Sequence, residues 1–215
     1  MNPRRLFVSA VALGLWLLTP TPAAAHRLDE YLQATRLSIN ADRVDLEIDL
    51  TAGVAVAPEV FNWIDTNRDG RISTSEGDTY ARQLLHSVSL TVDGRAASIE
   101  LTDVTVPQLR EMGLGVGTIQ VRATARIPAG AGRHRLSYLN THRPESSVYL
   151  VNALVPTSPR IQITGQDRDS GQHRLTLEYN VNTDSVWAGA WSLLAAMAMA
   201  GVLGVTRWPR RNATA

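Results

Sequence analysis

The sequence predicts a mainly β domain, an antiparallel β-sandwich with an inserted helix–loop–helix, placed between two apolar end segments. Apolar and polar residues alternate repeatedly between Tyr31 and Val181, as expected of strands with one buried face. Glycine, proline and aspartate separate these stretches at the places where turns are needed. Long apolar runs occur only near the two ends of the 215-residue chain. We therefore expect one exported domain with appendages.

The first 25 residues have the pattern of a signal peptide. Arg4 and Arg5 precede an apolar stretch from Leu6 to Leu18, and Ala23 to Ala25 supplies small residues for cleavage. Residues 1–25 are predicted to be removed, which makes His26 the first mature residue. An uncleaved anchor is the alternative, but the apolar stretch is short and ends in the helix-breaking sequence TPTP.

A second apolar run, Val186 to Thr206, contains no ionisable side chain. As a helix its 21 residues would cover about 30 Å, the thickness of a bilayer core. Arginines in the tail 207–215 place that tail in the cytoplasm by the positive-inside rule. The sequence thus predicts a single-pass protein of the bacterial cytoplasmic (inner) membrane, with residues 26–185 extracytoplasmic, 186–206 transmembrane and 207–215 cytoplasmic.

Five of the 21 basic residues lie in the predicted signal peptide or the tail, whereas all 20 acidic residues lie in the predicted outer domain. The outer domain therefore has 16 basic and 20 acidic residues and a charge of about −4. An acidic surface argues against nucleic acid as a partner. The chain contains no cysteine, which excludes disulfides, thiolate metal sites and a cysteine nucleophile.

The strands are predicted from their alternation. LQATRLSI (32–39) and RVDLEIDL (43–50) form a hairpin around the turn residues Asn40 to Asp42. Further strands are expected at 87–94, 96–104, 118–127, 134–139, 147–154, 160–165 and 173–181. The glycine-rich stretch 113–117 precedes a strand and is expected to be a loop. Strands at this spacing favour an antiparallel sandwich.

The interval from about 58 to 86 breaks the β pattern. Pro58 to Ile64 can start a helix with proline in its first turn, and Val60, Phe61 and Ile64 fall on one side. A second helical stretch, Ser75 to His86, follows. These two helices flank the sequence DTNRDGRISTSE, residues 65–76.

This twelve-residue loop has the ligand pattern of an EF-hand calcium site. Its positions 1, 3, 5, 7, 9 and 12 carry oxygen donors, and glycine at position 6 allows a sharp turn. The predicted calcium ligands are Asp65, Asn67, Asp69, the backbone carbonyl of Arg71, Ser73 through a water, and Glu76 as a bidentate carboxylate. The alternative is a degenerate loop that no longer binds an ion.

The loop has no second copy in the sequence, whereas such loops usually occur in pairs. Single extracellular modules of this kind bind calcium with dissociation constants of about 10⁻⁴ to 10⁻³ M. We therefore expect calcium to act as a structural ion.

Residues from Ala25 to Gly94 resemble the extracytoplasmic N-terminal domain of bacterial HupE/UreJ-type membrane proteins. The resemblance rests on AAAH, HRLDEYLQATRLSI, RVDLEIDL, the loop DTNRDGRISTSE, TYARQLLHSV and SLTVDG. It implies an extracytoplasmic calcium-loop domain in a family tied to nickel handling around hydrogenase and urease. Members usually carry several membrane helices. This chain has one predicted span, so transport is not carried over.

The leading hypothesis is a non-catalytic, membrane-anchored calcium-binding accessory protein, with another membrane protein as a candidate partner. No sequence motif of a hydrolase, metalloprotease, phosphate loop or dinucleotide site is present, and an unrecognised hydrolase is a minor alternative. A second hypothesis is a nickel or copper chaperone or sensor whose ligands are the amine and imidazole of His26. His134, His142 and His173 could complete such a site, although no two histidines have metal-ligand spacing.

Overall fold

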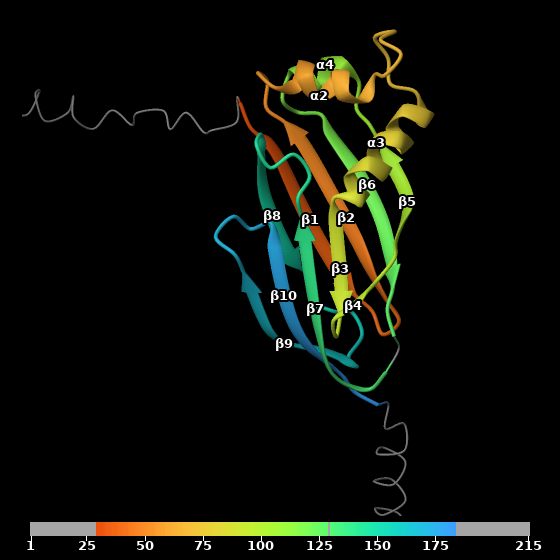
Figure 1. Ribbon diagram of the computed structural model, residues 1–215, viewed down its shortest axis with the longest axis vertical. Coiled ribbons are helices and arrows are strands. Elements are labelled where there is room, and N and C mark those ends of the chain that lie inside the picture. Colours follow the sequence, from red (N-terminus) through yellow and green to blue (C-terminus); the bar gives the residue numbers. More distant parts are fainter. Residues whose placement is uncertain (1–28, 129, 184–215) are drawn as a thin grey trace, which may run out of the picture.

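The computed structural model describes residues 29–128 and 130–183. Two five-stranded sheets pack face to face, with three helices at one end and residue 183 at the other (Figure 1). The first sheet has the order β5-β6-β2-β1-β8 and the second β4-β3-β7-β10-β9. The strands are β1 Tyr31–Ile39, β2 Arg43–Ala52, β3 Val88–Val92, β4 Arg95–Ala96, β5 Ile99–Thr105, β6 Thr118–Arg126, β7 Gly132–Asn140, β8 Ser147–Ala153, β9 Ile161–Arg168 and β10 Arg174–Val181. The helices are α2 Ala57–Ile64, α3 Thr74–His86 and α4 Leu109–Gly113.

The predicted mainly β class is confirmed, and so is the first hairpin, in which Ile39 pairs with Val44 and Tyr31 with Ala52. Alternate residues of β1 and β2 are buried, because a strand directs successive side chains to opposite faces of its sheet. The inward residues of both sheets form one apolar core between the layers.

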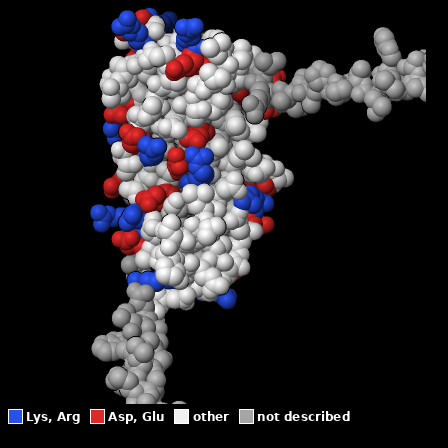
Figure 2. Space-filling model, turned by 180° about the vertical axis from the view of Figure 1, so that it is seen from behind, with Lys and Arg blue, Asp and Glu red and all other residues white. Residues whose placement is uncertain are grey.

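Outward-facing residues of the first sheet form a ladder of charges. Arg36 contacts Asp49 at 2.7 Å and its cross-strand partner Glu47 at 3.1 Å. Seen from behind, basic and acidic groups lie side by side over the upper and central part of the molecule (Figure 2). Such exposed pairs contribute little to stability, but they keep the outer face of the sheet polar.

Two sequence predictions about the fold are corrected, and one short helix was not predicted. The stretch 96–104 is not one strand, because β4 ends at Ala96 and β5 begins at Ile99 in the other sheet. The sandwich is not wholly antiparallel, since β8 pairs with β1 in parallel. The helix α4 was not predicted, and it ends at Gly113, where the glycine-rich stretch begins. These departures depend on long-range pairing or on elements too short for a clear period.

In the described part of the chain, residues 29–128 and 130–183, no helix is long and apolar enough to cross a bilayer. The predicted signal peptide 1–25, the predicted span 186–206 and the tail 207–215 lie outside the described residues.

A buried polar network joins the helical end to the sandwich. The hydroxyls of Tyr31 and Tyr80 are 2.7 Å apart, and Nε2 of His142 lies 3.2 Å from the Tyr80 hydroxyl. The Gln33 amide donates to the His142 carbonyl at 2.8 Å, and Asn140 donates to Gln33 at 2.9 Å. The network therefore links α3, β1 and the segment between β7 and β8.

A second contact holds α2 to the same segment. The guanidinium of Arg143 lies 3.5 Å above the ring of Trp63, and the Trp63 ring meets Tyr31 edge-on at 6.0 Å between centroids. Arg143 has a φ of 50°, which costs free energy for a residue with a side chain. The stacking is a stabilising contact that offsets part of this strain.

We expect acid to destabilise the protein through His142. Burial, with a smaller contribution from the charge of Arg143, lowers the pKa of His142 to about 4 from its usual 6.5. Between these values the unfolded chain binds the proton more readily, so this part of the stability is full above pH 6.5 and is lost as the pH falls to about 4. The unfolding equilibrium then shifts by up to about tenfold per pH unit.

Denaturant unfolding from pH 4 to pH 7 measures this effect. His142→Gln should flatten the pH dependence, while the control His86→Gln, at an exposed histidine of α3, should leave it unchanged. Equal slopes in the wild-type protein and His142→Gln would contradict the expectation.

Candidate metal centre

The loop from Asp65 to Glu76 lies between α2 and α3, as the sequence predicts. Pro58 lies in the first turn of α2, and Val60, Phe61 and Ile64 are buried along one side of this helix. The helix ends at Asp65, whose ψ of 81° leaves the helical region. Helix α3 begins after Ser73, one residue earlier than predicted.

The side chain of Asp65 closes the first half of the loop. Its two carboxylate oxygens accept hydrogen bonds from the backbone N–H groups of Asp69, at 3.1 Å, and Gly70, at 2.9 Å. Asn67 Oδ1 also accepts from Asp69 N–H, at 2.9 Å, and Asp69 Oδ1 accepts from Arg71 N–H, at 2.8 Å. The alternating oxygen-bearing side chains therefore fold the loop back on itself.

Glu76 closes the second half and joins both ends. Its Oε1 accepts from the N–H groups of Thr66 and Asn67, at 2.9 and 3.2 Å. Its Oε2 accepts from the N–H and the hydroxyl of Ser73, at 2.9 and 2.7 Å. Ser73 Oγ in turn accepts from Glu76 N–H at 3.3 Å, which completes a capping box at the start of α3.

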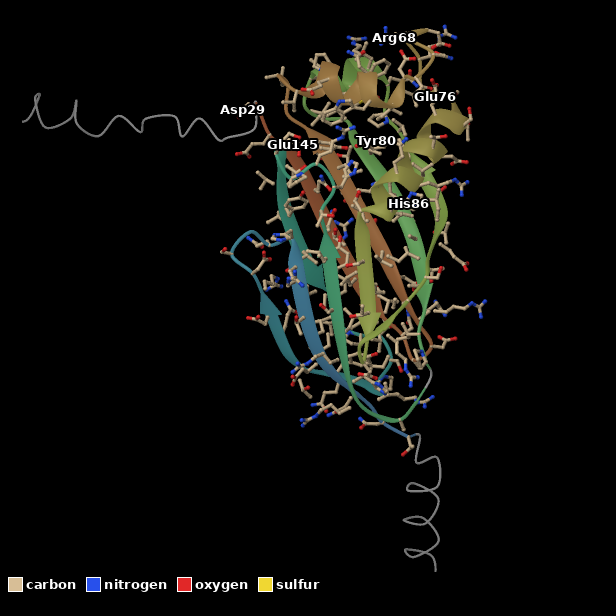
Figure 3. All side chains as sticks on the ribbon, in the orientation of Figure 1. Asp29, Arg68, Glu76, Tyr80, His86 and Glu145 are labelled. Carbon is tan, nitrogen blue, oxygen red and sulfur yellow. The ribbon has the colours of Figure 1, made fainter. Side chains whose placement is uncertain are left out.

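These hydrogen bonds favour the charged form of Glu76. The bonds from Ser73, followed by those from Asn67 and Thr66, lower the pKa of Glu76 to about 2. Asp65 and Glu76 are only 4% and 6% exposed, whereas Arg68 and Arg71 of the same loop are exposed. Figure 3 shows Arg68 at the outer tip of the loop and Glu76 at its base.

Neither buried carboxylate takes part in the ion pairs found among residues 29–128 and 130–183. At Glu76 the hydrogen bonds outweigh the cost of burial, so the group is held as an anion with no ion pair to compensate its charge. This gives the loop a chemical reason to attract a cation.

Only two of the six predicted ligand residues are buried inside the loop. Asp65 and Glu76 are buried in the loop, while Asn67, Asp69, Arg71 and Ser73 are exposed. In residues 29–128 and 130–183, no group of three or more His, Cys, Asp or Glu side chains is placed to hold a metal ion.

The donor set nevertheless fits a hard cation. Carboxylate, amide, hydroxyl and carbonyl oxygens suit calcium, and none of the six predicted donors is a nitrogen or sulfur that nickel or copper would prefer. Asp65, Asn67, Asp69, Arg71, Ser73 and Glu76 are the residues that would hold the ion.

The histidines of the alternative transition-metal site have separate partners. His134 Nδ1 lies 2.7 Å from Asp93, His173 Nδ1 lies 2.7 Å from Asp169, and His142 contacts Tyr80. His134 and His173 lie at opposite ends of the paired strands β7 and β10. His26 lies outside the described residues.

Contacts around the loop include some that the sequence did not suggest. Thr66 donates both its N–H and its hydroxyl to Glu76, although position 2 of the loop is not a ligand position. The contacts of Tyr80 with His142 and of Trp63 with Arg143 join residues more than 60 positions apart, and no local pattern indicates them.

The chain matches no known family model and no curated protein.

We expect Gly70→Ala to lower the free energy of unfolding by about 1 to 2 kcal/mol, because a side chain strains the left-handed conformation. Gly70 has a φ of 79°, and a Cβ there would meet no atom within 4 Å, so backbone strain is the sole cost. Urea denaturation in the presence of a chelator measures this change.

The matched control is Gly113→Ala, at the end of α4, where there is open space and no positive φ. That variant should be neutral or slightly more stable. A Gly70→Ala protein as stable as the wild type would contradict the expected strain.

Proposed function

We propose that this protein is a non-catalytic, extracytoplasmic calcium-binding accessory protein, anchored in the cytoplasmic membrane by its C-terminal segment. Calcium is bound by the loop Asp65 to Glu76. The β-sandwich serves as a binding module for another protein of the membrane or of the extracytoplasmic space.

The observation that carries this proposal is the burial of the Asp65 and Glu76 carboxylates in one loop, where neither forms an ion pair with any residue that the structure describes. Backbone amides already orient both groups, at 2.9 to 3.2 Å. Gly70 has the positive φ that the sharp turn requires. A divalent cation would neutralise the two charges, and an all-oxygen donor set selects calcium over softer metals.

The position of the loop supports a structural role for the ion. The loop lies at the end of the sandwich opposite to residue 183, after which the predicted membrane span begins (Figure 1). Calcium there would stabilise the helical end of the domain farthest from the anchor. It would do so by tying the end of α2 to the beginning of α3.

Calorimetric titration of calcium into chelator-treated protein tests the proposal. We expect one site with a dissociation constant of about 10⁻⁴ to 10⁻³ M, and a higher melting temperature at saturating calcium. Asp65→Ala and Glu76→Gln should abolish both. Glutamine at position 76 can keep the capping box, so Glu76→Gln separates the loss of charge from the loss of the helix cap.

Asp78→Asn is the matched control, because Asp78 is a partly exposed carboxylate of α3 outside the loop and lies 3.8 Å from Arg82. It should leave calcium binding unchanged. A protein that binds no calcium but binds one nickel or copper ion tightly, and loses that ion in His26→Ala, would replace this proposal with the transition-metal hypothesis.

A further inference from the structure

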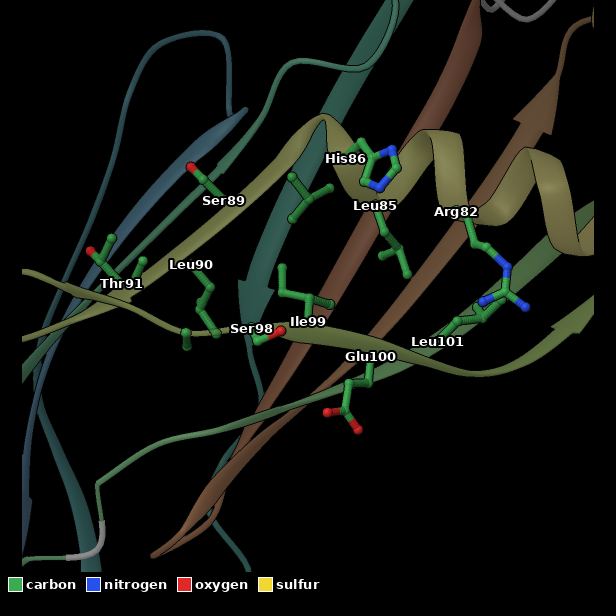
Figure 4. A pocket seen from close by; sticks show the side chains of 13 residues that line it. Arg82, Leu85, His86, Ser89, Leu90, Thr91, Ser98, Ile99, Glu100 and Leu101 are labelled. Atoms are coloured by element: carbon green, nitrogen blue, oxygen red, sulfur yellow. The ribbon is translucent and has the colours of Figure 1, made fainter.

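A groove lies at the open side of the sandwich, where the edges of the two sheets diverge. The last turn of α3 forms its upper end, β3 and β4 form one wall, and β5 forms the other (Figure 4). Its volume is about 690 Å³. Leu85, Ile99 and Leu101 contribute apolar surface to it, and Arg82 and His86 lie at the helix end.

The backbone of β3 is only partly paired where it borders this groove. Ser87 and Asp93 face β7, since Thr141 N–H donates to Ser87 C=O at 2.9 Å and Asp93 N–H donates to Arg135 C=O at 2.8 Å. Successive residues of a strand direct their backbone groups to opposite edges, so Val88 and Leu90 face the groove.

Strand β4 covers only part of this edge. It pairs with Thr91 and Val92, and one further bond joins Ala97 N–H to Leu90 C=O at 2.9 Å. In the described chain, no backbone hydrogen bond satisfies the N–H and C=O of Val88 or the N–H of Leu90. Val88 and Leu90 are only 8% and 2% exposed, so a partner reaches these groups through the groove, and unpaired groups at a strand edge are a template for an added strand.

The opposite wall is less suited to strand addition. The pairing of β5 with β6 shifts register between Leu101 and Asp103, and such a bulge twists an edge away from new partners. Glu100 lies in the groove wall formed by β5, and an edge charge of this kind also disfavours pairing. The free edge of β3 is therefore the docking edge.

We propose that this groove binds a short extended segment of another protein by adding it as a strand to β3. The N–H and C=O of Val88 and the N–H of Leu90 supply the backbone hydrogen bonds, and the apolar side chains of the segment pack on Leu85, Ile99 and Leu101. An acidic residue of the segment lies near Arg82 and His86. This inference goes beyond calcium binding and does not depend on it.

Charge and geometry set the direction and length of the segment. Arg82 is largely exposed and contacts Asp78 only at 3.8 Å, so its charge is open to a partner. Helix α3 ends at His86, next to Val88, where β3 begins. A segment whose acidic C-terminal residue lies near Arg82 and His86 therefore runs in the opposite direction to β3. Because β3 begins at Val88 and β4 pairs from Thr91 onward, the added segment lies only beside Val88, Ser89 and Leu90.

A fluorescent peptide panel tests this inference on the full-length protein. Each acetylated hexapeptide alternates Val, Ile, Leu or Phe with Thr and ends in Glu. Its matched control carries N-methyl groups at the pairing amides. Anisotropy should detect binding by at least one member at up to about 1 mM. Each N-methyl group should weaken binding about two- to tenfold, because it removes one backbone donor.

Hydrogen exchange measured by mass spectrometry locates the bound segment. We expect slower exchange in the fragment that contains Val88 to Val92 and no change in β8. Arg82→Glu should weaken the acidic peptides several-fold and favour peptides that end in Lys. Arg110→Glu, at an exposed arginine of α4, is the matched control and should change neither.

Three results would overturn the proposal. These are no binding by any member of the panel, binding that is insensitive to N-methylation, and protection confined to β5 or another strand. Protection of β3 that instead rises with protein concentration, together with dimer formation in sedimentation, would identify a second copy of the chain as the occupant.

Discussion

The hydrogen bond between the hydroxyls of Tyr31 and Tyr80 fixes where α3 lies on the sandwich, and the loop and the groove both follow from that position. Tyr31 begins β1, which is held on both sides by β2 and β8, so its hydroxyl is a rigid reference point. Burial raises the pKa of both tyrosines, that of Tyr80 to about 12, so both groups stay neutral. Moving α3 would leave buried hydroxyls without partners, which costs more than a typical hydrogen bond contributes.

This constraint reaches the loop through the helical repeat. Glu76 lies four residues before Tyr80, and therefore on the same face of α3 one turn nearer its start (Figure 3). Once Tyr80 is held against β1, the Glu76 carboxylate is directed to the loop, where it meets Thr66, Asn67 and Ser73. Trp63 and Arg143 hold α2 in a comparable way, so both ends of the loop have fixed positions.

Much of this arrangement could be predicted from the sequence, because alternation and turn residues are local signals. The first hairpin, most of the other strands and both helices around the loop were predicted to within a few residues. The division of residues 96–104 could not be predicted, because Ala97 and Ser98 form only a short break between strands that join different sheets. The parallel pairing of β1 with β8 joins segments more than 100 residues apart and has no local signature.

The candidate site shows the same division between local and long-range information. The positions of Asp65, Asn67, Asp69, Ser73 and Glu76 follow from loop spacing alone. The role of Thr66 as a donor to Glu76 depends on loop closure, and the contacts of His142 and Arg143 depend on how β7 and β8 are placed. The unpaired groups of Val88 and Leu90 become evident only when the short length of β4 is known.

The hydrogen bonds of Glu76 also bear on how an ion could act. A ligand shifts a conformational equilibrium only by its difference in affinity for the two states. In this loop the two buried carboxylates are already turned inward and held by backbone amides, so the main adjustment left to an ion is the rotation of the exposed side chains of Asn67, Asp69 and Ser73. Little of the binding free energy would then be used to reorient α2 and α3. This supports a stabilising ion over a trigger, and on this view the binding of a segment that we propose for the groove at the far end of α3 would not require calcium.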